Sequence, residues 1–222
     1  MIVLHHLENS RSHRVLWLLE ELGLTYEIVP HKRNPKTFRA PPELLAIHPL
    51  GRAPIIVDDG RVVAESGAII QYLIEVHAEG RLAVPPDAPN YRDYQYWIHY
   101  AEGSAMPPLL VKFIAMRIPG AVPFFIRPIA HVISDALQKS YTDPEIALHQ
   151  NFWERRLAER EWFAGSEFTA ADIQMSYPVE VSLMRAGSEG AFPAIQRFIE
   201  RIRQRPAYQR AITVGGGLST LD

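Results

Sequence analysis

The chain has 222 residues, of which 47% are hydrophobic and 22% charged, and its formal net charge is −2. This length allows one large domain or two small ones, and the weak charge excludes a broad electrostatic attraction to nucleic acid or to an anionic membrane surface. The absence of cysteine excludes disulfides, thiolate zinc sites and mixed disulfides with a thiol ligand.

The first predicted elements alternate between strand and helix. Residues 2–6 and 25–29 read as strands, and residues 12–22 carry apolar side chains at helical spacing. Gly23 follows that helix, and glycine is typical of the position after a helix C-terminus. Ser12 is expected to cap the start of the helix, because a serine hydroxyl can accept a hydrogen bond from an exposed backbone N–H group there.

The next segment combines a proline with a β-hairpin. Residues 55–57 read as a short strand, which an Asp-Gly turn signal connects to an antiparallel return over residues 61–64. Pro54 cannot donate to a sheet, so it belongs at the start of the strand. An X-Pro bond can be cis, and a cis bond here would free the backbone of Ala53 for an extended ligand. A trans bond in a plain loop is the alternative.

An acidic and a hydroxyl residue follow the hairpin. Ser66 is a good N-cap for a helix predicted over residues 67–79. The N-terminus of a helix has unpaired N–H groups and a partial positive charge, which suit a carboxylate, and the neighbouring Glu65 can accept an ammonium group. The pair therefore predicts a site for an amino-acid zwitterion, whereas the simpler alternative is a cap beside a solvated glutamate.

A proline-rich segment divides the chain. Three prolines between residues 85 and 89 forbid a helix, and they predict a stiff linker over residues 81–90 between domains 1–80 and 91–222. Helices are predicted in the second domain over residues 91–116 with an interruption at Pro107-Pro108, then over 123–139, 143–162, 170–185 and 193–204. Asp143-Pro144-Glu145 has the cap, proline and acid of a helix start, and the glycines at 215–217 predict a loose tail.

Three short motifs carry a resemblance that covers nearly the whole chain. Arg52-Ala53-Pro54, Glu65-Ser66 and Thr169-Ala-Ala-Asp172 resemble motifs of the cytosolic glutathione transferases, of the bacterial and fungal type. The last of them resembles a capping box, in which the threonine and the aspartate satisfy each other's exposed N–H groups. The resemblance implies a β-α-β-α-β-β-α thioredoxin-like domain that binds glutathione, an all-α C-terminal helical bundle domain that carries the electrophile pocket, and a homodimer.

The chemistry of that family needs a group that favours the glutathione thiolate. The pKa of a free thiol is about 8.5, so little thiolate exists at neutral pH, and a hydrogen-bond donor to the sulfur increases that fraction. The family places a Tyr, Ser or Cys donor between the first strand and the first helix. The loop over residues 6–12 contains no tyrosine or cysteine, so we predict that Ser10 is the donor, with the amide of Asn9 as the alternative.

The resemblance implies the other ligand contacts residue by residue. Those for glutathione are the backbone of Ala53 beside Pro54, then Glu65 and Ser66 for the γ-glutamyl end, and Arg52 and Arg39 for the glycyl carboxylate, which arginine binds with two hydrogen bonds. The candidates for the hydrophobic electrophile, on the long helix after the linker, are Tyr100, Ser104 and Met106.

The resemblance implies a glutathione transferase that acts in detoxification, with glutathione as its co-substrate, and we expect a cytoplasmic location. Glutathione-dependent peroxide or disulfide reduction and a non-catalytic glutathione-binding module are the alternatives. We expect no metal, because His5 and His6 are adjacent in a strand and point to opposite faces. We expect no membrane partner either, because no apolar run reaches the roughly 18 residues of a bilayer span and the N-terminus lacks a signal-peptide pattern.

Overall fold

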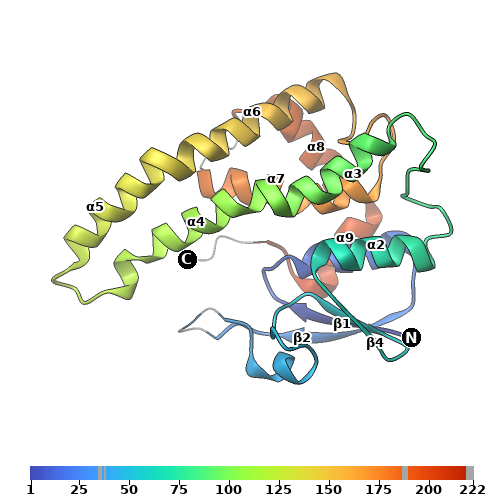
Figure 1. Cartoon of the computed structure of the whole chain (residues 1–222), viewed down its shortest axis with the longest axis horizontal. Coiled ribbons are helices and arrows are strands. Elements are labelled where there is room, and N and C mark those ends of the chain that lie inside the picture. Colours follow the sequence, from blue (N-terminus) through green and yellow to red (C-terminus); the bar gives the residue numbers. More distant parts are fainter. Residues whose placement is uncertain (35–36, 38, 187–189, 219–222) are drawn as a thin grey trace.

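A computed structural model describes residues 1–34, 37, 39–186 and 190–218. A four-stranded sheet forms the N-terminal part, and helices form the remainder (Figure 1). The order of the strands is β2-β1-β3-β4. The central strand β1 (Ile2–Leu7) runs parallel to β2 (Tyr26–His31) and antiparallel to β3 (Ile55–Asp58), which pairs with β4 (Arg61–Ala64). The predicted thioredoxin-like α/β domain is confirmed by this mixed sheet.

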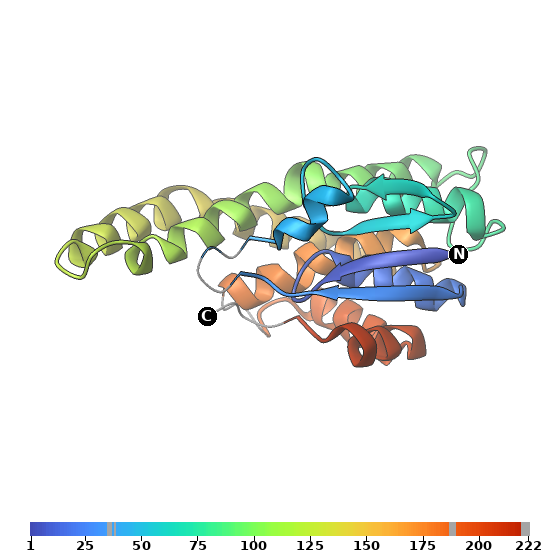
Figure 2. The ribbon, with the colours of Figure 1, turned by 90° about the horizontal axis from the view of Figure 1, so that it is seen from below.

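Two helices, α1 (Ser12–Leu22) and α2 (Ser66–His77), cover one face of the sheet, and Figure 2 shows the strands in front of them. The inward side chains of the sheet, such as Leu4 and Ile56, are fully buried against these helices. The helix predicted over residues 12–22 has the same bounds in the structure, and it ends at Gly23 in the left-handed conformation (φ 63°), which glycine adopts without a steric penalty.

The connection between β2 and β3 differs from the implied arrangement. A short 3₁₀ turn, Pro42–Ala46, occupies the place of the second helix. The chain then reaches β3 through the Ala53-Pro54 peptide bond, which is cis. Pro54 is buried and directly precedes the first residue of β3, as expected for a residue that cannot donate to the sheet.

The first long helix of the C-terminal part continues through the predicted interruption. Helix α3 (Tyr91–Tyr100) passes into a π-helical turn (Ala101–Ala105) and then into α4 (Met106–Arg117). Pro107 and Pro108 lie in the first turn of α4. A π-helical turn already shifts the backbone hydrogen bonds from their α-helical partners, so the missing N–H groups of the prolines do not break the helix here.

The helix predicted from Asp143 begins there, but as the continuation of a longer helix. Helix α5 (Arg127–Leu137) continues through a π-helical turn (Gln138–Thr142) into α6 (Asp143–Glu159). The carboxylate of Asp143 accepts a hydrogen bond from the ammonium group of Lys112 on α4 instead of capping its own helix. A contact between two helices therefore replaces the local cap that the sequence pattern suggested.

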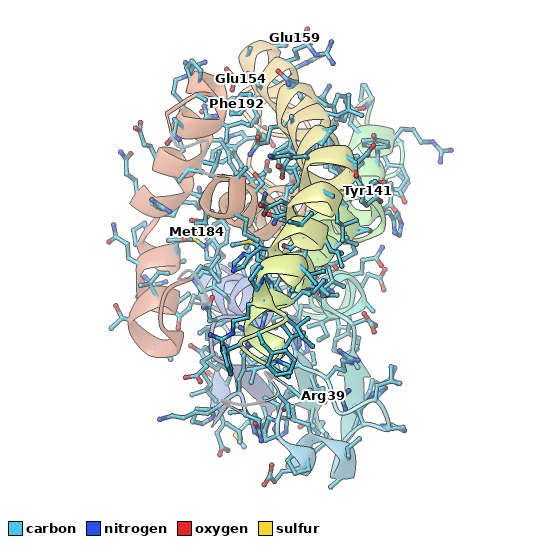
Figure 3. The ribbon with its side chains drawn as sticks, turned by 90° about the vertical axis from the view of Figure 1, so that its left-hand side faces the viewer. Arg39, Tyr141, Glu154, Glu159, Met184 and Phe192 are labelled. Atoms are coloured by element: carbon cyan, nitrogen blue, oxygen red, sulfur yellow. The ribbon has the colours of Figure 1, made fainter. Side chains whose placement is uncertain are left out.

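Helix α7 (Ala170–Ala186) lies at the centre of the helical part, and most of its side chains are buried. The capping box at its start is present in part. The N–H group of Thr169 donates to Asp172 Oδ2 (2.9 Å), but the Thr169 hydroxyl accepts from the N–H of Ala171 rather than from that of Asp172. At the start of α8 (Pro193–Gln204), Glu154 of α6 lies beside Phe192 (Figure 3) and accepts hydrogen bonds from two backbone N–H groups.

The last helix, α9 (Pro206–Gly215), returns to the N-terminal part and packs against α1. The ring of Tyr208 meets the ring of Trp17 edge-on, with 5.0 Å between the centroids, and Gly215 O accepts a hydrogen bond from His6 Nε2 (2.9 Å). A Cβ added at Gly215 would lie 2.5 Å from Leu16 Cδ2. The predicted loose tail is therefore wrong at Gly215, where glycine permits a close approach of the backbone.

No helix among the described residues combines the length and the apolar character that crossing a bilayer requires. Within the same residues, no three histidine, aspartate or glutamate side chains gather closely enough to hold a metal ion.

Candidate functional site

A cavity of about 600 Å³ lies between the sheet part and the helices α4 and α7, within the size range of small-molecule sites. A smaller recess of about 90 Å³ adjoins it at the start of α2. The two spaces share Arg11, Leu50, Arg52 and Ala53 as lining residues. They form one continuous site that begins at the cis-proline loop and ends against the helical wall.

The structure brings most of the predicted site residues to this site. Those that line the larger cavity are Ser10, Arg39, Arg52, Ala53 and Met106. Those that line the recess are Arg52, Ala53, Pro54, Glu65 and Ser66. Asn9 precedes Ser10 in the left-handed conformation (φ 47°), which asparagine tolerates better than most residues, but its side chain is not among the lining groups.

Two of the three residues predicted for the electrophile lie elsewhere. Tyr100 is only 9% exposed, and its hydroxyl is hydrogen-bonded to His149 Nδ1 and accepts from Trp153 Nε1. Ser104 is exposed on the π-helical turn and lines neither space. Tyr100 points into the packed interior and Ser104 toward solvent, so a place on the long helix after the linker did not bring these two residues to the cavity.

The loop between β1 and α1 contains a chain of hydrogen bonds that ends at Ser10. Ser12 Oγ lies 3.0 Å from His6 Nδ1 and accepts from the N–H group of Leu7 (3.1 Å). Ser10 Oγ lies 2.7 Å from Leu7 O and 2.9 Å from Ser12 Oγ. The predicted cap role of Ser12 is wrong, since its hydroxyl bonds back to the strand. Its own N–H group, the first of α1, donates to Ser10 Oγ (3.2 Å).

The positions of the hydrogen atoms in this series of hydrogen bonds follow from Gly215 O, the acceptor at its other end. Gly215 O can only accept, so His6 Nε2 carries a hydrogen atom. Burial lowers the pKa of His6, which keeps the ring neutral and leaves Nδ1 as an acceptor for the hydroxyl of Ser12. Among the described residues, Leu7 O and Ser12 Oγ are then the acceptors within reach of the Ser10 hydroxyl hydrogen, which can turn toward a ligand in the cavity.

Ser66 is the first residue of α2 rather than its cap. Its hydroxyl donates to Glu102 Oε1 (3.1 Å) and accepts from Arg14 Nη2 (3.0 Å). Arg14 is fully buried and also forms an ion pair with Glu102. Burial disfavours the charge on Glu102, but Arg14 and Arg11 outweigh it and hold the pKa of this carboxyl below its ordinary value. The network fixes the start of α2 beside the recess.

Glu65 has an unusual backbone conformation, with φ 72° and ψ 120°. A residue other than glycine at positive φ is uncommon, and such conformations occur often at binding sites. The side chain of Glu65 is exposed at the recess. This arrangement can present the carboxylate to a ligand ammonium group, as the sequence suggested.

Sequence reasoning missed several residues of the site. The arginine at position 14 interrupts an otherwise apolar helix face, and this signal could have marked a buried cation with an acidic partner. Other residues from distant segments complete the lining of the larger cavity, and no pattern in the sequence indicated them. They are Arg33, Leu110, Phe113, Tyr177 and Arg185.

A separate cavity of about 480 Å³ lies between α7, α8 and α9. Its only carboxylate among the described lining residues is Glu180, which is buried and already accepts hydrogen bonds from Arg203 and Tyr208. We assign no chemistry to it, because these partners satisfy the one buried acid that it contains.

A thioredoxin-like domain joined to a helical domain, with a cavity between them beside a cis-proline loop, defines the class of two-domain glutathione transferases. Residues 1–75 match the glutathione S-transferase N-terminal domain, and residues 113–206 match the C-terminal domain of the same family.

Relatives and solved structures agree with these matches. The chain is 36% identical over 207 residues to glutathione S-transferase 3 of Schizosaccharomyces pombe, with 93% of this chain and 85% of the relative covered. It is 34% identical to glutathione S-transferase 1 of Saccharomyces cerevisiae, with 94% and 92% covered. A crystal structure of a glutathione S-transferase from Actinobacillus pleuropneumoniae superposes with a TM-score of 0.81 at 33% identity, over 99% and 95% of the chains. The chain belongs to the glutathione transferase family, and it is an enzyme of that class.

Proposed function

We propose that this transferase activates glutathione with Ser10 and directs the thiolate at an electrophile bound against α4 and α7. The continuity of the site supports the proposal, since the recess at the cis-proline loop and the cavity at Ser10 share four lining residues. A tripeptide bound in the recess could therefore extend its sulfur into the larger space.

The recess suits the γ-glutamyl end of glutathione. In this proposal Glu65 accepts the ammonium group, while the start of α2 and Ser66 receive the α-carboxylate. The cysteinyl part pairs with the backbone of Ala53, and the glycyl carboxylate meets Arg52 and Arg39 at the rim of the larger cavity.

Ser10 is the better candidate of the two predicted donors, because it lines the cavity and Asn9 does not. When the thiolate is present, the Ser10 hydrogen turns from Leu7 O toward the sulfur. The thiol proton passes to solvent, the sulfur then bonds to the electrophilic carbon, and the leaving group departs with its bonding electrons. The nearby Arg11 guanidinium adds positive charge beside the sulfur.

Replacing Ser10 by alanine is expected to raise the thiol pKa of bound glutathione by about one unit, and to lower kcat/KM about tenfold, because one hydrogen bond to the charged sulfur is lost. Titration of the thiolate by its ultraviolet absorbance measures the shift. Ser104→Ala, which changes an exposed serine outside the cavity, is the control and should leave the titration unchanged. A shift with Asn9→Ala and none with Ser10→Ala would transfer the role to Asn9.

The reaction itself is tested with a chlorinated dinitrobenzene. We expect a thioether of glutathione and release of chloride. Formation of glutathione disulfide from a peroxide or disulfide substrate, without any thioether, would instead support the reductase alternative. Binding of glutathione by calorimetry without turnover of either probe would support the non-catalytic module.

We also propose that the enzyme is a homodimer. An arm formed by α4 and α5 extends beyond the sheet (Figures 1 and 2), and it exposes large apolar side chains, namely Phe124, Phe125, Ile129, Val132 and Ile133. Several large apolar side chains exposed on one arm are typical of a protein interface.

Placing a charge in this surface should dissociate the dimer. We expect Val132→Glu to sediment as a monomer at concentrations at which the unchanged protein is dimeric, because burying an unpaired carboxylate costs several kcal/mol. Val214→Glu is the matched control, because it makes the same change at an exposed valine on α9. A monomeric unchanged protein, or equal sedimentation of both variants, would contradict this interface.

A cytoplasmic location and a role in detoxification complete the proposal. Cell fractionation checks the location. Survival of a deletion strain under exposure to electrophiles checks the role, and unchanged survival would contradict it.

A further inference from the structure

The charged side chains among the described residues that line the larger cavity are all positive. Its lining arginines are Arg11, Arg33, Arg39, Arg52 and Arg185, and its described lining residues include no aspartate or glutamate. Arg11 is paired with Glu102, and Arg39 and Arg52 lie on the glutathione side in the proposed function. Arg185 comes from the opposite, helical wall, where glutathione chemistry does not require a cation.

Arg185 is held in place without a carboxylate. Its Nη1 donates to Leu109 O (2.8 Å), and its guanidinium lies 4.9 Å from the centroid of the Phe113 ring. No aspartate or glutamate of the described residues forms an ion pair with it. A carbonyl and an aromatic ring fix the position of the group but leave its full charge to be balanced.

The electrostatics at this wall favour an incoming anion. Burial lowers the pKa of Arg185, and the positive charges of Arg11 and Arg33 lower it further, although Tyr177 acts in the opposite direction. Burial likewise lowers the pKa of Arg33 and outweighs the opposite effects of Tyr177 and Glu8. Desolvated cations that repel one another gain stability when a negative charge enters between them.

Tyr177 adds a hydroxyl to the same wall. It lies eight positions before Arg185 on α7, and both residues line the cavity. The ring of Tyr177 contacts the guanidinium of Arg14, at 5.3 Å from its centroid. Its hydroxyl forms no hydrogen bond with the described residues, so it can donate to a ligand.

We propose that the electrophile of this enzyme carries a carboxylate, which Arg185 and Tyr177 bind while Arg33 contributes positive charge. The inference rests on the proposed function and specifies its second substrate. The apolar side chains of Met106, Leu110 and Phe113 line the same wall and pack against the carbon skeleton. The carboxylate takes no part in the bond changes, because its role is to orient the electrophilic carbon toward the sulfur at Ser10.

Two probes that share the same ring and leaving group test the proposal, namely a chloro-dinitrobenzoate and its methyl ester. With either probe the glutathione sulfur bonds to the ring carbon, the carbon–chlorine bond breaks, and chloride leaves with the electron pair. Each kcat/KM is divided by the rate constant of the uncatalysed reaction with glutathione, which removes the difference in intrinsic reactivity. We expect the corrected value to be at least about tenfold higher for the carboxylate, as one charged hydrogen bond would produce.

Substitutions at the cavity wall formed by α4 and α7 test which residues cause the preference for the carboxylate probe. Arg185→Gln should remove most of the carboxylate preference, and Arg185→Lys should restore part of it. Tyr177→Phe should reduce the preference by a smaller factor. Arg117→Gln is the matched control, because Arg117 also lies over the Phe113 ring (5.5 Å) but does not line the cavity, and it should keep the full preference.

The outcomes separate the inference from the proposed function. Conjugation of the ester with an equal or higher corrected value would overturn the inference and leave the transferase proposal intact. If neither probe reacts, the proposed conjugation fails, and calorimetry of the unchanged protein with the two preformed conjugates decides the inference. Tighter binding of the carboxylate conjugate supports it, and equal binding overturns it.

Discussion

Replacing Glu102 by glutamine is expected to lower the free energy of unfolding by about 3–5 kcal/mol, the cost of breaking a buried ion pair from one side. The reason is the position of its partner. Arg14 is fully buried and, besides Glu102, has only the Gln174 carbonyl (2.7 Å) and the Ser66 hydroxyl (3.0 Å) as hydrogen-bond acceptors among the described residues. Without Glu102 the guanidinium charge remains inside the protein unbalanced.

Urea denaturation measures this loss of stability. Glu161→Gln is the control, because its ion pair with Arg201 joins side chains that are 56% and 29% exposed, and such pairs contribute less than about 1 kcal/mol. A change below 1 kcal/mol for Glu102→Gln would contradict the structural role of the buried pair.

The same pair predicts a dependence on pH. The pKa of Glu102 in the folded protein lies below the ordinary value of 4.5, since Arg14 and Arg11 outweigh the effect of burial. The unfolded chain therefore takes up a proton first as the pH falls, and the stabilisation is present above pH 4.5 and lost as the pH falls through the folded value. Stability curves of the unchanged protein should fall more steeply there than those of Glu102→Gln.

The second large effect is expected at Asp172, which holds the start of the central helix α7. Its carboxyl oxygens accept from the N–H groups of Phe163 (2.8 Å) and Thr169 (2.9 Å) and from the Thr169 hydroxyl. Asp172→Ala should lower the free energy of unfolding by about 3 kcal/mol or more, because two buried N–H groups lose their acceptors at about 1–3 kcal/mol each. Asp172→Asn keeps one acceptor oxygen and should lose about half as much.

Thermal and urea denaturation of Asp172→Ala and Asp172→Asn check whether the alanine variant loses more stability than the asparagine variant. Ser176→Ala is a control in the same helix, because its hydroxyl donates only to the Ile173 carbonyl of its own helix, and little stability should be lost there. Equal stability of Asp172→Ala and the unchanged protein would contradict a role of this residue in fixing α7.

The contribution of Asp172 to stability is expected to depend on pH with the opposite sign to that of Glu102. Burial raises its pKa to about 7, although the hydrogen bonds from Thr169 and Phe163 act in the other direction. A raised folded pKa means that the contribution is fully present below the unfolded value and is lost as the pH rises toward 7. The stability difference between the unchanged protein and Asp172→Asn should therefore decrease between about pH 4 and pH 7.

The short-range elements were predictable because their signals lie within a few residues of each other. The strand over residues 61–64 and the helices over 12–22 and 193–204 have the predicted bounds. Each depends on a side-chain period, a turn pair or a glycine that acts on its own segment. The motifs at Ala53-Pro54 and Glu65-Ser66 marked the recess for the same reason.

The partners of the polar groups were not predictable in this way. Ser12 and Ser66 both stand where a cap is expected, yet the strand and the buried Arg14–Glu102 pair take up their hydroxyls. The π-helical turns, which keep two long helices continuous, likewise contradicted the breaks that prolines and caps suggest. At the two serines, a partner outside the helix start took the place of the expected local hydrogen bond.

The sequence by itself determined the sheet hairpin, the main helices and the residues that line the recess, because neighbouring residues decide these features through backbone preference and period. Only the tertiary structure decided that α9 closes over α1 at Gly215 and that Tyr177 and Arg185 face Ser10 across the cavity. These groups are more than 160 residues apart along the chain, so their proximity depends on how whole elements pack, which no local pattern encodes.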